Sequence, residues 1–350
     1  MNLPGALAYY VSAHGYGHGA RSGDILGAFN RLRPGFPVLV TSDLPASFFL
    51  SRLSSSANSF RAGSFDVGMV QLDSIRADVA ATLERVEGVY ARRPELVAGE
   101  IAFFRRHDVR LVVADIPALP LEAAAEAGIA RIAVGNFGWD WIYSKFVDRD
   151  PRWARMIGLI QDGYARADLL LRLPFSDEMK VFPRRQDIPL VARPGTSRRA
   201  EIAARTGARE SFRWVLLSFT SLDWNDEALD RVARLSGYEF FVVDPLAWRR
   251  GNIHAIDRNL IPFSDVLASV DGVVSKPGFG IVSECLVNRK PLVYAERTDF
   301  LEYGLLKAAI DRYLKSIHIP AARLYAGDIA GALEPLWERP EPRESEIPGS

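Results

Sequence analysis

Two histidines lie four residues apart in a glycine-rich stretch near the start of the chain, His14-Gly15-Tyr16-Gly17-His18-Gly19. They follow the apolar run 7–12, which predicts a first β-strand, and we expect an amphipathic helix from Asp24 to about Leu32. Imidazole is the side chain best suited to take a proton near neutral pH. One of these histidines is therefore a candidate general base, and a structural role for both is the alternative. The glycine spacing matches neither a dinucleotide fingerprint nor a P-loop.

Asp115 is the second candidate catalytic residue, because it ends the strongly apolar run 109–115. In open α/β sheets, ligands bind at the carboxyl ends of the strands. A carboxylate there can contact His18, select its tautomer and stabilise its protonated form. Alternatively, Asp115 caps the next predicted helix, Leu119 to Ala127. The two roles are compatible.

An aromatic segment follows the predicted strand 130–134 and contains Asn136, Trp139 and Asp140. Aromatic faces stack on the C–H surfaces of sugars, while amides and carboxylates bind hydroxyls, so the segment suits a sugar-like acceptor. Aromatic packing at a domain edge is the alternative. The run Asp148-Arg149-Asp150 matches a metal-binding pattern, but it lacks a strand before it, and we predict a loop without metal.

A second glycine-rich stretch, Ser275 to Glu284, joins the apolar run 271–274 to an apolar helical pattern. Glycines let the backbone approach a ligand, and a helix that begins there offers free N–H groups to an anion. Lys276 adds a positive charge, and Glu284 can accept hydrogen bonds from a ribose. The stretch therefore predicts a nucleotide site, although a plain turn with a solvent-facing Glu284 has the same pattern.

Strand and helix patterns alternate in both halves of the chain, which predicts an α/β protein with two doubly wound Rossmann-like domains. We expect a first domain at 1–173, with 168–173 as its last strand, and a flexible loop within 44–75. A linker at 174–199, a second domain at 200–337 and a disordered tail at 338–350 complete the prediction. After the strand at 291–294 only helices are expected.

Composition narrows the class of protein. The chain has 350 residues, of which 43 are Lys or Arg and 43 are Asp or Glu. This balance gives no global field for nucleic acid or anionic membranes. One cysteine, Cys285, excludes an internal disulfide and fits a reducing compartment. We see neither a signal peptide nor a run long enough to span a membrane, and expect a cytoplasmic protein, with peripheral membrane contact left open.

The two α/β halves, with a histidine loop in the first and a nucleotide-type loop in the second, resemble GT-B glycosyltransferases. The run "PFSDVLASVDGVVSKPGFGIVSE" is similar to the donor-site signature of transferases that make glycosides and peptidoglycan lipid intermediates. The resemblance places His18 where inverting members carry a catalytic histidine and Asp115 where they carry its orienting acid. It also implies that the two domains face across a cleft, with the acceptor site in the domain at 1–173 and the nucleotide-sugar donor site in the domain at 200–337. The donor-binding residues would be Thr220, Ser221, Ile261, Phe263, Ser275, Lys276, Pro277, Gly278, Phe279, Gly280, Glu284, Asp299 and Glu302. The acceptor-binding residues would be His14, Gly15, Tyr16, Gly17, Asn136, Trp139 and Asp140.

In detail, Ile261 and Phe263 would lie near the base, Lys276 to Gly280 would hold the diphosphate, and Glu284 would bind the ribose. Asp299 or Glu302 would bind the donor sugar.

A longer resemblance is to the amino-terminal, glycosyltransferase-like half of L-arabinokinases. It extends over almost the whole chain through "YYVSAHGYGHGARS", "VVADIPALPLEAAAEAGI", "NFGWDWIY" and "SKPGFGIVSE". One departure concerns the loop after Phe219, which reads Thr220-Ser221-Leu222 where such proteins often have a Gly-Gly pair near the phosphates. Larger side chains there would narrow or abolish the donor site.

The sequence therefore predicts an inverting, metal-independent glycosyltransferase that moves a sugar from a nucleotide-sugar, a UDP-sugar by expectation, to a small-molecule or lipid-linked hydroxyl acceptor. No cofactor and no nucleic-acid partner are expected. A non-catalytic sugar- or nucleotide-sensing module and a nucleotide-sugar 2-epimerase are the alternatives.

Overall fold

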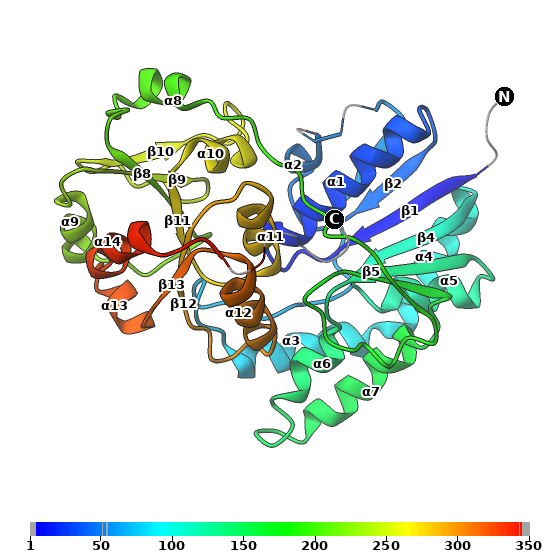
Figure 1. Cartoon of the computed structure of the whole chain (residues 1–350). Helices are drawn as coiled ribbons and strands as arrows, with labels where there is room; N and C mark the ends of the chain where they lie inside the picture. Colours follow the sequence, from blue (N-terminus) through cyan, green and yellow to red (C-terminus); the bar gives the residue numbers. More distant parts are fainter. Residues whose placement is uncertain (1–4, 51, 54, 343, 345–350) are drawn as a thin grey trace. The chain divides into compact units, whose positions relative to one another are not determined.

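The computed structural model describes residues 5–50, 52–53, 55–342 and 344. The described chain forms two compact units (Figure 1). Of the described residues, the first unit comprises those up to 70 together with 78–191, and the second comprises 71–77 together with those from 192 to 344. The segment 71–77 therefore belongs to the second unit although it lies within the first half of the sequence.

The first unit is built on a seven-stranded sheet in the order β3-β2-β1-β4-β5-β6-β7, in which all neighbours are parallel. Its strands are β1 (Ala6–Val11), β2 (Val38–Thr41), β3 (Asn58–Arg61), β4 (Val109–Asp115), β5 (Ala130–Gly135), β6 (Leu169–Arg172) and β7 (Arg185–Asp187). Its helices are α1 (Tyr16–Leu32), α2 (Ala46–Leu50), α3 (Val79–Ala91), α4 (Arg93–Arg106), α5 (Leu119–Glu126), α6 (Trp139–Ser144) and α7 (Arg152–Tyr164). The central strand β1 is buried throughout and β4 is buried from Val112 to Asp115, which explains the apolar runs in the sequence.

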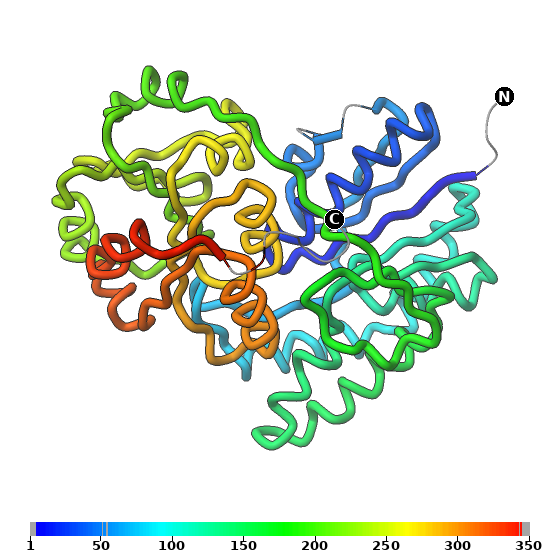
Figure 2. Tube along the Cα trace, in the orientation of Figure 1, coloured from blue at the N-terminus to red at the C-terminus, as the bar shows by residue number. Residues whose placement is uncertain are grey.

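The second unit repeats the design with a six-stranded parallel sheet in the order β10-β9-β8-β11-β12-β13. Its strands are β8 (Arg213–Ser218), β9 (Tyr238–Val243), β10 (Ile253–Ile256), β11 (Gly272–Ser275), β12 (Leu292–Ala295) and β13 (Ser316–Ile319). Its helices are α8 (Arg199–Thr206), α9 (Asp226–Ala233), α10 (Phe263–Ser269), α11 (Phe279–Val287), α12 (Glu302–Tyr313), α13 (Ala321–Tyr325) and α14 (Ala330–Glu338). Figure 2 traces the chain by colour from blue at the N-terminus to red at the C-terminus.

Several local elements differ from the sequence-based expectation. Helix α1 begins at Tyr16 and not at Asp24, so His18 lies in its first turn and not in a loop. The region 44–75 contains α2 and β3, and β6 is not the last strand of its sheet, because β7 follows within 174–199. Strands β10 and β13 were not expected. Of the predicted tail 338–350, residues 343 and 345–350 lie outside the described residues.

Side-chain caps and one glycine account for several helix ends. Asp78 accepts a hydrogen bond from the Ala81 N–H at the start of α3, and Asn225 does the same with Ala228 at α9. Gly207 ends α8 with a left-handed backbone, φ 76°.

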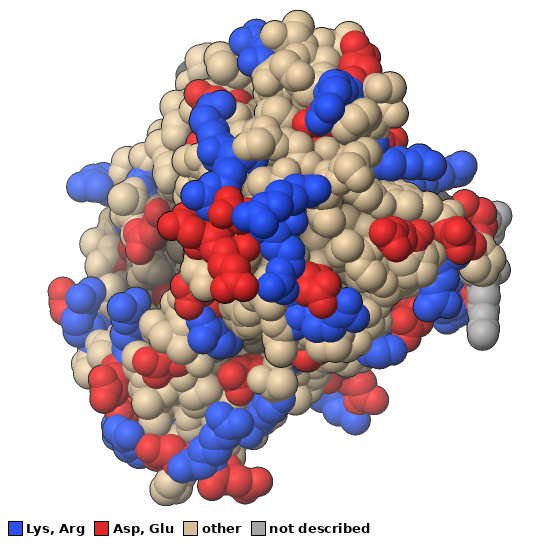
Figure 3. Space-filling view, turned by 90° about the vertical axis from the view of Figure 1, so that its left-hand side faces the viewer, with Lys and Arg blue, Asp and Glu red and all other residues tan. Residues whose placement is uncertain are grey.

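On the face drawn in Figure 3, basic and acidic side chains lie interspersed, as the balanced composition leads one to expect. Among the described residues, no helix is long and apolar enough to cross a membrane.

Candidate functional site

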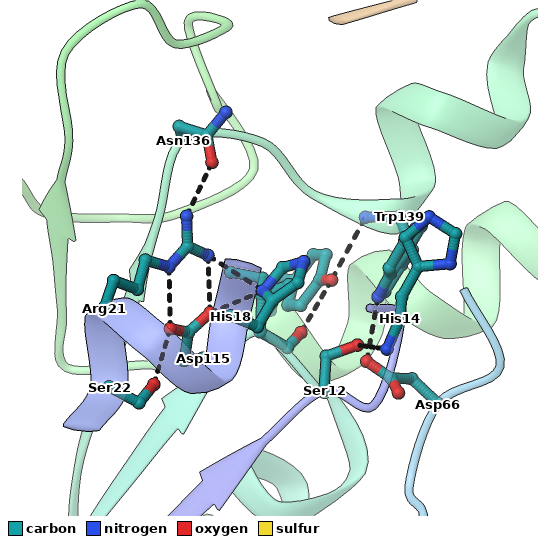
Figure 4. A network of polar contacts seen from close by, with 11 residues as sticks. Ser12, His14, His18, Arg21, Ser22, Asp66, Asp115, Asn136 and Trp139 are labelled. Carbon is teal, nitrogen blue, oxygen red and sulfur yellow. Dashed lines mark hydrogen bonds and ion pairs between the residues drawn. The ribbon is translucent and has the colours of Figure 1, made fainter. Parts of the chain in front are cut away.

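Three polar side chains of α1 point to one acidic residue of the first unit. His18, Arg21 and Ser22 are spaced i, i+3 and i+4, so they share one face of the helix, and all three are buried. Asp115 ends β4, which pairs in parallel with β1, the strand before this helix. The carboxylate is fully buried and lies at the centre of the cluster (Figure 4).

Asp115 accepts hydrogen bonds at both of its oxygens. Oδ1 lies 2.8 Å from His18 Nδ1 and accepts from Arg21 Nη2, while Oδ2 accepts from Arg21 Nε at 2.7 Å and from Ser22 Oγ at 2.8 Å. Arg21 Nη1 donates to Asn136 Oδ1 at 2.8 Å. The expected contact between His18 and Asp115 is therefore present. Asp115 does not cap the next helix, because the residue at the N-cap of α5 is Ala118.

Arg21 competes with Asp115 for the same histidine nitrogen. His18 Nδ1 lies 2.8 Å from Asp115 Oδ1 and 3.0 Å from Arg21 Nη2. If Nδ1 carries the hydrogen, it donates to Asp115 and leaves Nε2 free to take a proton. If Nδ1 lacks the hydrogen, it accepts from Arg21, and Nε2 carries the hydrogen and is no base. The carboxylate favours the first tautomer and the guanidinium favours the second.

Asp115 is held in its charged form. Burial raises the pKa of this carboxyl. The charge and hydrogen bonds of Arg21, followed by those of His18, outweigh burial and hold the pKa well below its usual value. The carboxylate is thus ionised at neutral pH, and Arg21 balances its charge. It can orient His18, but it has less charge left to stabilise an imidazolium than an unpaired carboxylate would have.

Two of the predicted acceptor residues, His14 and Trp139, lie near a second polar group, Asp66, which sequence reasoning missed (Figure 4). Trp139 Nε1 donates to Asp66 Oδ2 at 2.8 Å, and burial raises the pKa of this carboxyl. The ring of Trp139 also lies edge to face with that of His14, with 5.1 Å between centroids. His14 Nδ1 accepts from the Met69 N–H at 3.1 Å, which places the hydrogen of the neutral ring on Nε2.

The other acceptor candidates divide by burial. Asn136, Trp139 and Asp140 are buried, and Gln161 Nε2 donates to Asp140 Oδ2 at 3.2 Å. The aromatic segment is thus packed into its own unit. The partly exposed candidates on the β1–α1 connection and the first turn of α1 are His14, Gly15, Tyr16 and Gly17.

In the second unit, β11 leads into α11 through the predicted anion loop. Gly278 is the N-cap of α11 and makes no side-chain cap hydrogen bond, and the start of this helix carries the positive end of the helix dipole. A β-carbon at position 278 would collide with Lys276 Nζ, which shows that the ammonium group folds back over Gly278. Ser275, Pro277 and Phe279 are buried beside it.

Burial and, after it, the charge of Arg297 together lower the pKa of Lys276 to about 7, whereas the charge of Glu302 opposes this shift. Arg297 follows β12, Glu302 begins α12, and the two form an ion pair at 3.9 Å. Arg297 was missed by sequence reasoning. Its position two residues after a strand end, close to a lysine loop, is the signal that could have found it.

The remaining donor candidates differ in exposure. Glu284 lies on α11 and Asp299 follows β12, and both are partly exposed. Phe263 begins α10 and is also partly exposed, as is Gly280 in the first turn of α11. Ile261 is fully buried, so its side chain is not accessible to a base in this structure.

Thr220 and Ser221 are exposed, but their backbone N–H groups are engaged. Both donate to Ser74 Oγ at 3.1 Å, and the Ser74 N–H donates to the Ser221 carbonyl at 3.0 Å. The segment 71–77 is anchored around this contact: Ile75 lies in the hydrophobic core of the second unit, and Tyr325 Oη donates to Asp73 at 2.9 Å. Nothing in the sequence signals this placement, since 71–77 lies between elements of the first sheet.

The donor and acceptor residues of the prediction thus fall into separate units, with His18 and Asp115 in contact in the first and the Lys276 loop in the second. Among the described residues, no group of three or more His, Cys, Asp or Glu side chains could hold a metal ion.

Known proteins resemble this chain in sequence and in fold. An L-arabinokinase of Arabidopsis thaliana is 29% identical over 345 residues, which are 95% of this chain and 32% of that protein. The chain therefore spans about a third of the length of this curated relative. No protein-family model matches the chain.

Solved structures of glycosyltransferases have a similar fold. The glycotransferase of kitacinnamycin gives a TM-score of 0.62 at 17% identity, covering 95% of this chain and 90% of that one. Phytolacca americana UGT2, solved with UDP-2fluoro-glucose and pterostilbene, gives 0.62 at 15% identity, with 96% and 90% covered. Two parallel sheets with flanking helices and this likeness together show that the chain has the GT-B glycosyltransferase fold.

Proposed function

We propose that this protein transfers a sugar from a nucleotide-sugar, a UDP-sugar by preference, to an acceptor hydroxyl. The observation that carries the proposal is the buried contact of His18 Nδ1 with Asp115 at the carboxyl ends of β1 and β4. This is the place where ligands bind in open α/β sheets. The fold shared with glycosyltransferases, one of them solved with a UDP-sugar analogue, supports the same reaction class.

In this mechanism, the acceptor hydroxyl gives its proton to His18 Nε2 as its oxygen attacks the anomeric carbon. Asp115 holds the imidazole in the tautomer with hydrogen on Nδ1 and accepts from that hydrogen as the ring becomes charged. The bond between the anomeric carbon and the diphosphate breaks, and the electron pair leaves with the diphosphate. Direct attack inverts the anomeric configuration. The first amides of α11 and Lys276 stabilise the leaving charge without a metal.

The first experiment is a calorimetric binding screen of the purified chain against UDP, GDP, dTDP, ADP and their sugars, with Glu284→Ala as the variant that loses the ribose contact. The nucleotide-sugar that binds is then incubated with panels of small-molecule and lipid-linked hydroxyl acceptors, and products are detected by mass spectrometry. NMR of the product gives the anomeric configuration, and EDTA in the assay tests metal independence.

His18→Ala should lower kcat by about 10²- to 10⁴-fold while donor affinity stays within a factor of two, because general-base help of this kind has that size. His107→Ala is the matched control, since His107 is an exposed histidine of the same unit outside the cluster. Unchanged turnover of His18→Ala would remove the mechanism.

A second candidate function is a non-catalytic nucleotide- or sugar-binding module. The contact of Ser74 with the Thr220 and Ser221 amides favours it, because these amides are occupied by the chain itself. Such a module binds a nucleotide-sugar but gives no product with any acceptor, and His18→Ala does not change its binding.

A further inference from the structure

Arg297 is a buried cation without hydrogen-bonded neighbours. It is 2% exposed and lies over the ring of Phe300, with 3.1 Å from its central carbon to the ring centroid. Among the described residues, none of its three guanidinium nitrogens has a hydrogen-bond partner. Glu302, 3.9 Å away, forms an ion pair with it but is too distant for a hydrogen bond. Burying the N–H donors of a charged group without hydrogen bonds costs free energy. This arrangement therefore points to a missing acceptor.

Lys276 brings a second cation to the same edge of the sheet. Ser275, at the end of β11, is paired with Tyr294 of β12, so the loops that follow these two strands are neighbours. Lys276 begins the first loop and Arg297 lies in the second. The pKa of Lys276 is lowered to about 7 by burial and then by Arg297, which is the effect of two cations that share a poorly solvated place.

The counter-charge at this place is incomplete. Two positive side chains face Glu302, the carboxylate whose charge acts on both of them. Asp73 and Asp299 also act on Arg297, but Asp73 already accepts from Arg76 and Tyr325. The first turn of α11, which starts behind Lys276, adds the positive end of a helix dipole.

We propose that Arg297 and Lys276 form a two-cation subsite that binds an oxyanion group of the ligand held at the start of α11. The planar guanidinium presents parallel N–H groups that match two oxygens of one phosphate or one carboxylate. The inference rests on the proposed donor site and adds that its ligand carries a second anionic contact. That anion is either the diphosphate itself or the carboxylate of a uronic-acid donor sugar.

The test measures affinity by calorimetry for four probes: inorganic pyrophosphate, UDP, UDP-glucose and UDP-glucuronate. The full chain is compared with Arg297→Met, which removes the charge at similar side-chain length. It is also compared with Arg297→Lys, which keeps the charge but lacks the parallel N–H groups of the guanidinium. Arg289→Met is the matched control, since Arg289 is an exposed arginine just beyond the other end of α11. Thermal unfolding checks that each variant is folded.

Arg297→Met should weaken the relevant probes by about 10- to 100-fold, Arg297→Lys by less, and Arg289→Met by less than twofold. An equal loss for pyrophosphate, UDP and both sugars assigns Arg297 to the diphosphate. A loss confined to UDP-glucuronate assigns it to a sugar carboxylate. The inference is overturned if Arg297→Met binds all four probes as the parent does, or if the parent binds none of them. A chain that binds them but transfers no sugar refutes the proposed transferase activity and leaves the subsite standing.

Discussion

Asp115 in the first unit and Arg297 in the second are both buried charged side chains close to strand ends, but their surroundings differ. Asp115 accepts hydrogen bonds from Arg21 and Ser22, contacts His18, and has an opposite charge in direct contact. Arg297 has a carboxylate only at 3.9 Å and, among the described residues, no hydrogen-bond partner. Arg21 balances the charge of Asp115 within the protein, whereas by our proposal an anionic ligand balances that of Arg297.

The difference has a functional meaning. A self-contained cluster keeps His18 in a fixed orientation before any substrate arrives, which is what a proton-transfer group requires. A pair of undercompensated cations stores unfavourable free energy that an anionic ligand can release on binding. In the proposed function, the first site serves proton transfer and the second serves ligand affinity.

The largest expected effect concerns stability, and it separates the two arginines. Arg21→Met leaves the Asp115 carboxylate buried without its counter-charge, so the free energy of unfolding should fall by about 3–5 kcal/mol. Arg297→Met removes a buried charge that has no hydrogen bonds, so it should leave stability unchanged or raise it by about 1 kcal/mol. Urea unfolding of each unliganded variant measures both values. Equal losses in the free energy of unfolding for the two variants would contradict the difference between the Asp115 and Arg297 surroundings.

The pH dependence of stability should show the same contrast in two separate windows. The folded-state pKa of Asp115 lies below its unfolded value, so its contribution is present above about pH 4 and is lost as pH falls through the folded pKa. The folded-state pKa of Lys276 is about 7, below the ordinary lysine value of 10.5, so the unfolded state binds more protons between these two pH values. Stability should therefore rise with pH across that range.

Unfolding measured from pH 2 to pH 10.5 tests both windows. Asp115→Asn should reduce the pH dependence of the free energy of unfolding on the acid side. Lys276→Met should reduce it on the alkaline side. Saturating pyrophosphate should also flatten the alkaline window, because a bound anion restores the charged form of Lys276. A rise between pH 7 and 10.5 that persists in Lys276→Met would show that another group causes it.

The strands that hold the sites could be predicted from the sequence because they are buried on both faces. The apolar runs at β1, β4, β8 and β9 stand out for this reason, and Asp115 could be matched with His18 because parallel strands end at one edge. The start of α1 was misplaced by eight residues, since glycines 17 and 19 weaken the helical pattern. Arg21 was missed for the same reason: without the correct helix start, its place beside His18 is not visible.

Other features depend on contacts between distant residues, for which the sequence offers little local signal. Asp66 becomes notable only through Trp139, and Arg297 only through its burial next to the Lys276 loop. Strand β7, with all three residues exposed, has no apolar pattern to reveal it. The association of residues 71–77 with the second unit is fixed by Ile75 and by the Ser74 hydrogen bonds, which only the folded chain displays.

The smallest expected effect concerns this last segment and asks whether the second site is partly closed by the chain itself. Ser74→Ala removes the acceptor of the Thr220 and Ser221 N–H groups, so stability should fall by about 1 kcal/mol, a moderate loss because these exposed residues can turn to water. If the freed amides belong to the diphosphate site, pyrophosphate should bind Ser74→Ala more tightly, by about 3- to 10-fold. Ser211→Ala, at an exposed serine of the same unit, controls for the loss of a hydroxyl. Weaker pyrophosphate binding by Ser74→Ala would mean that the contact supports the anion site and does not compete with it. The affinity of the second unit for pyrophosphate would then depend on Ser74 as well as on Arg297.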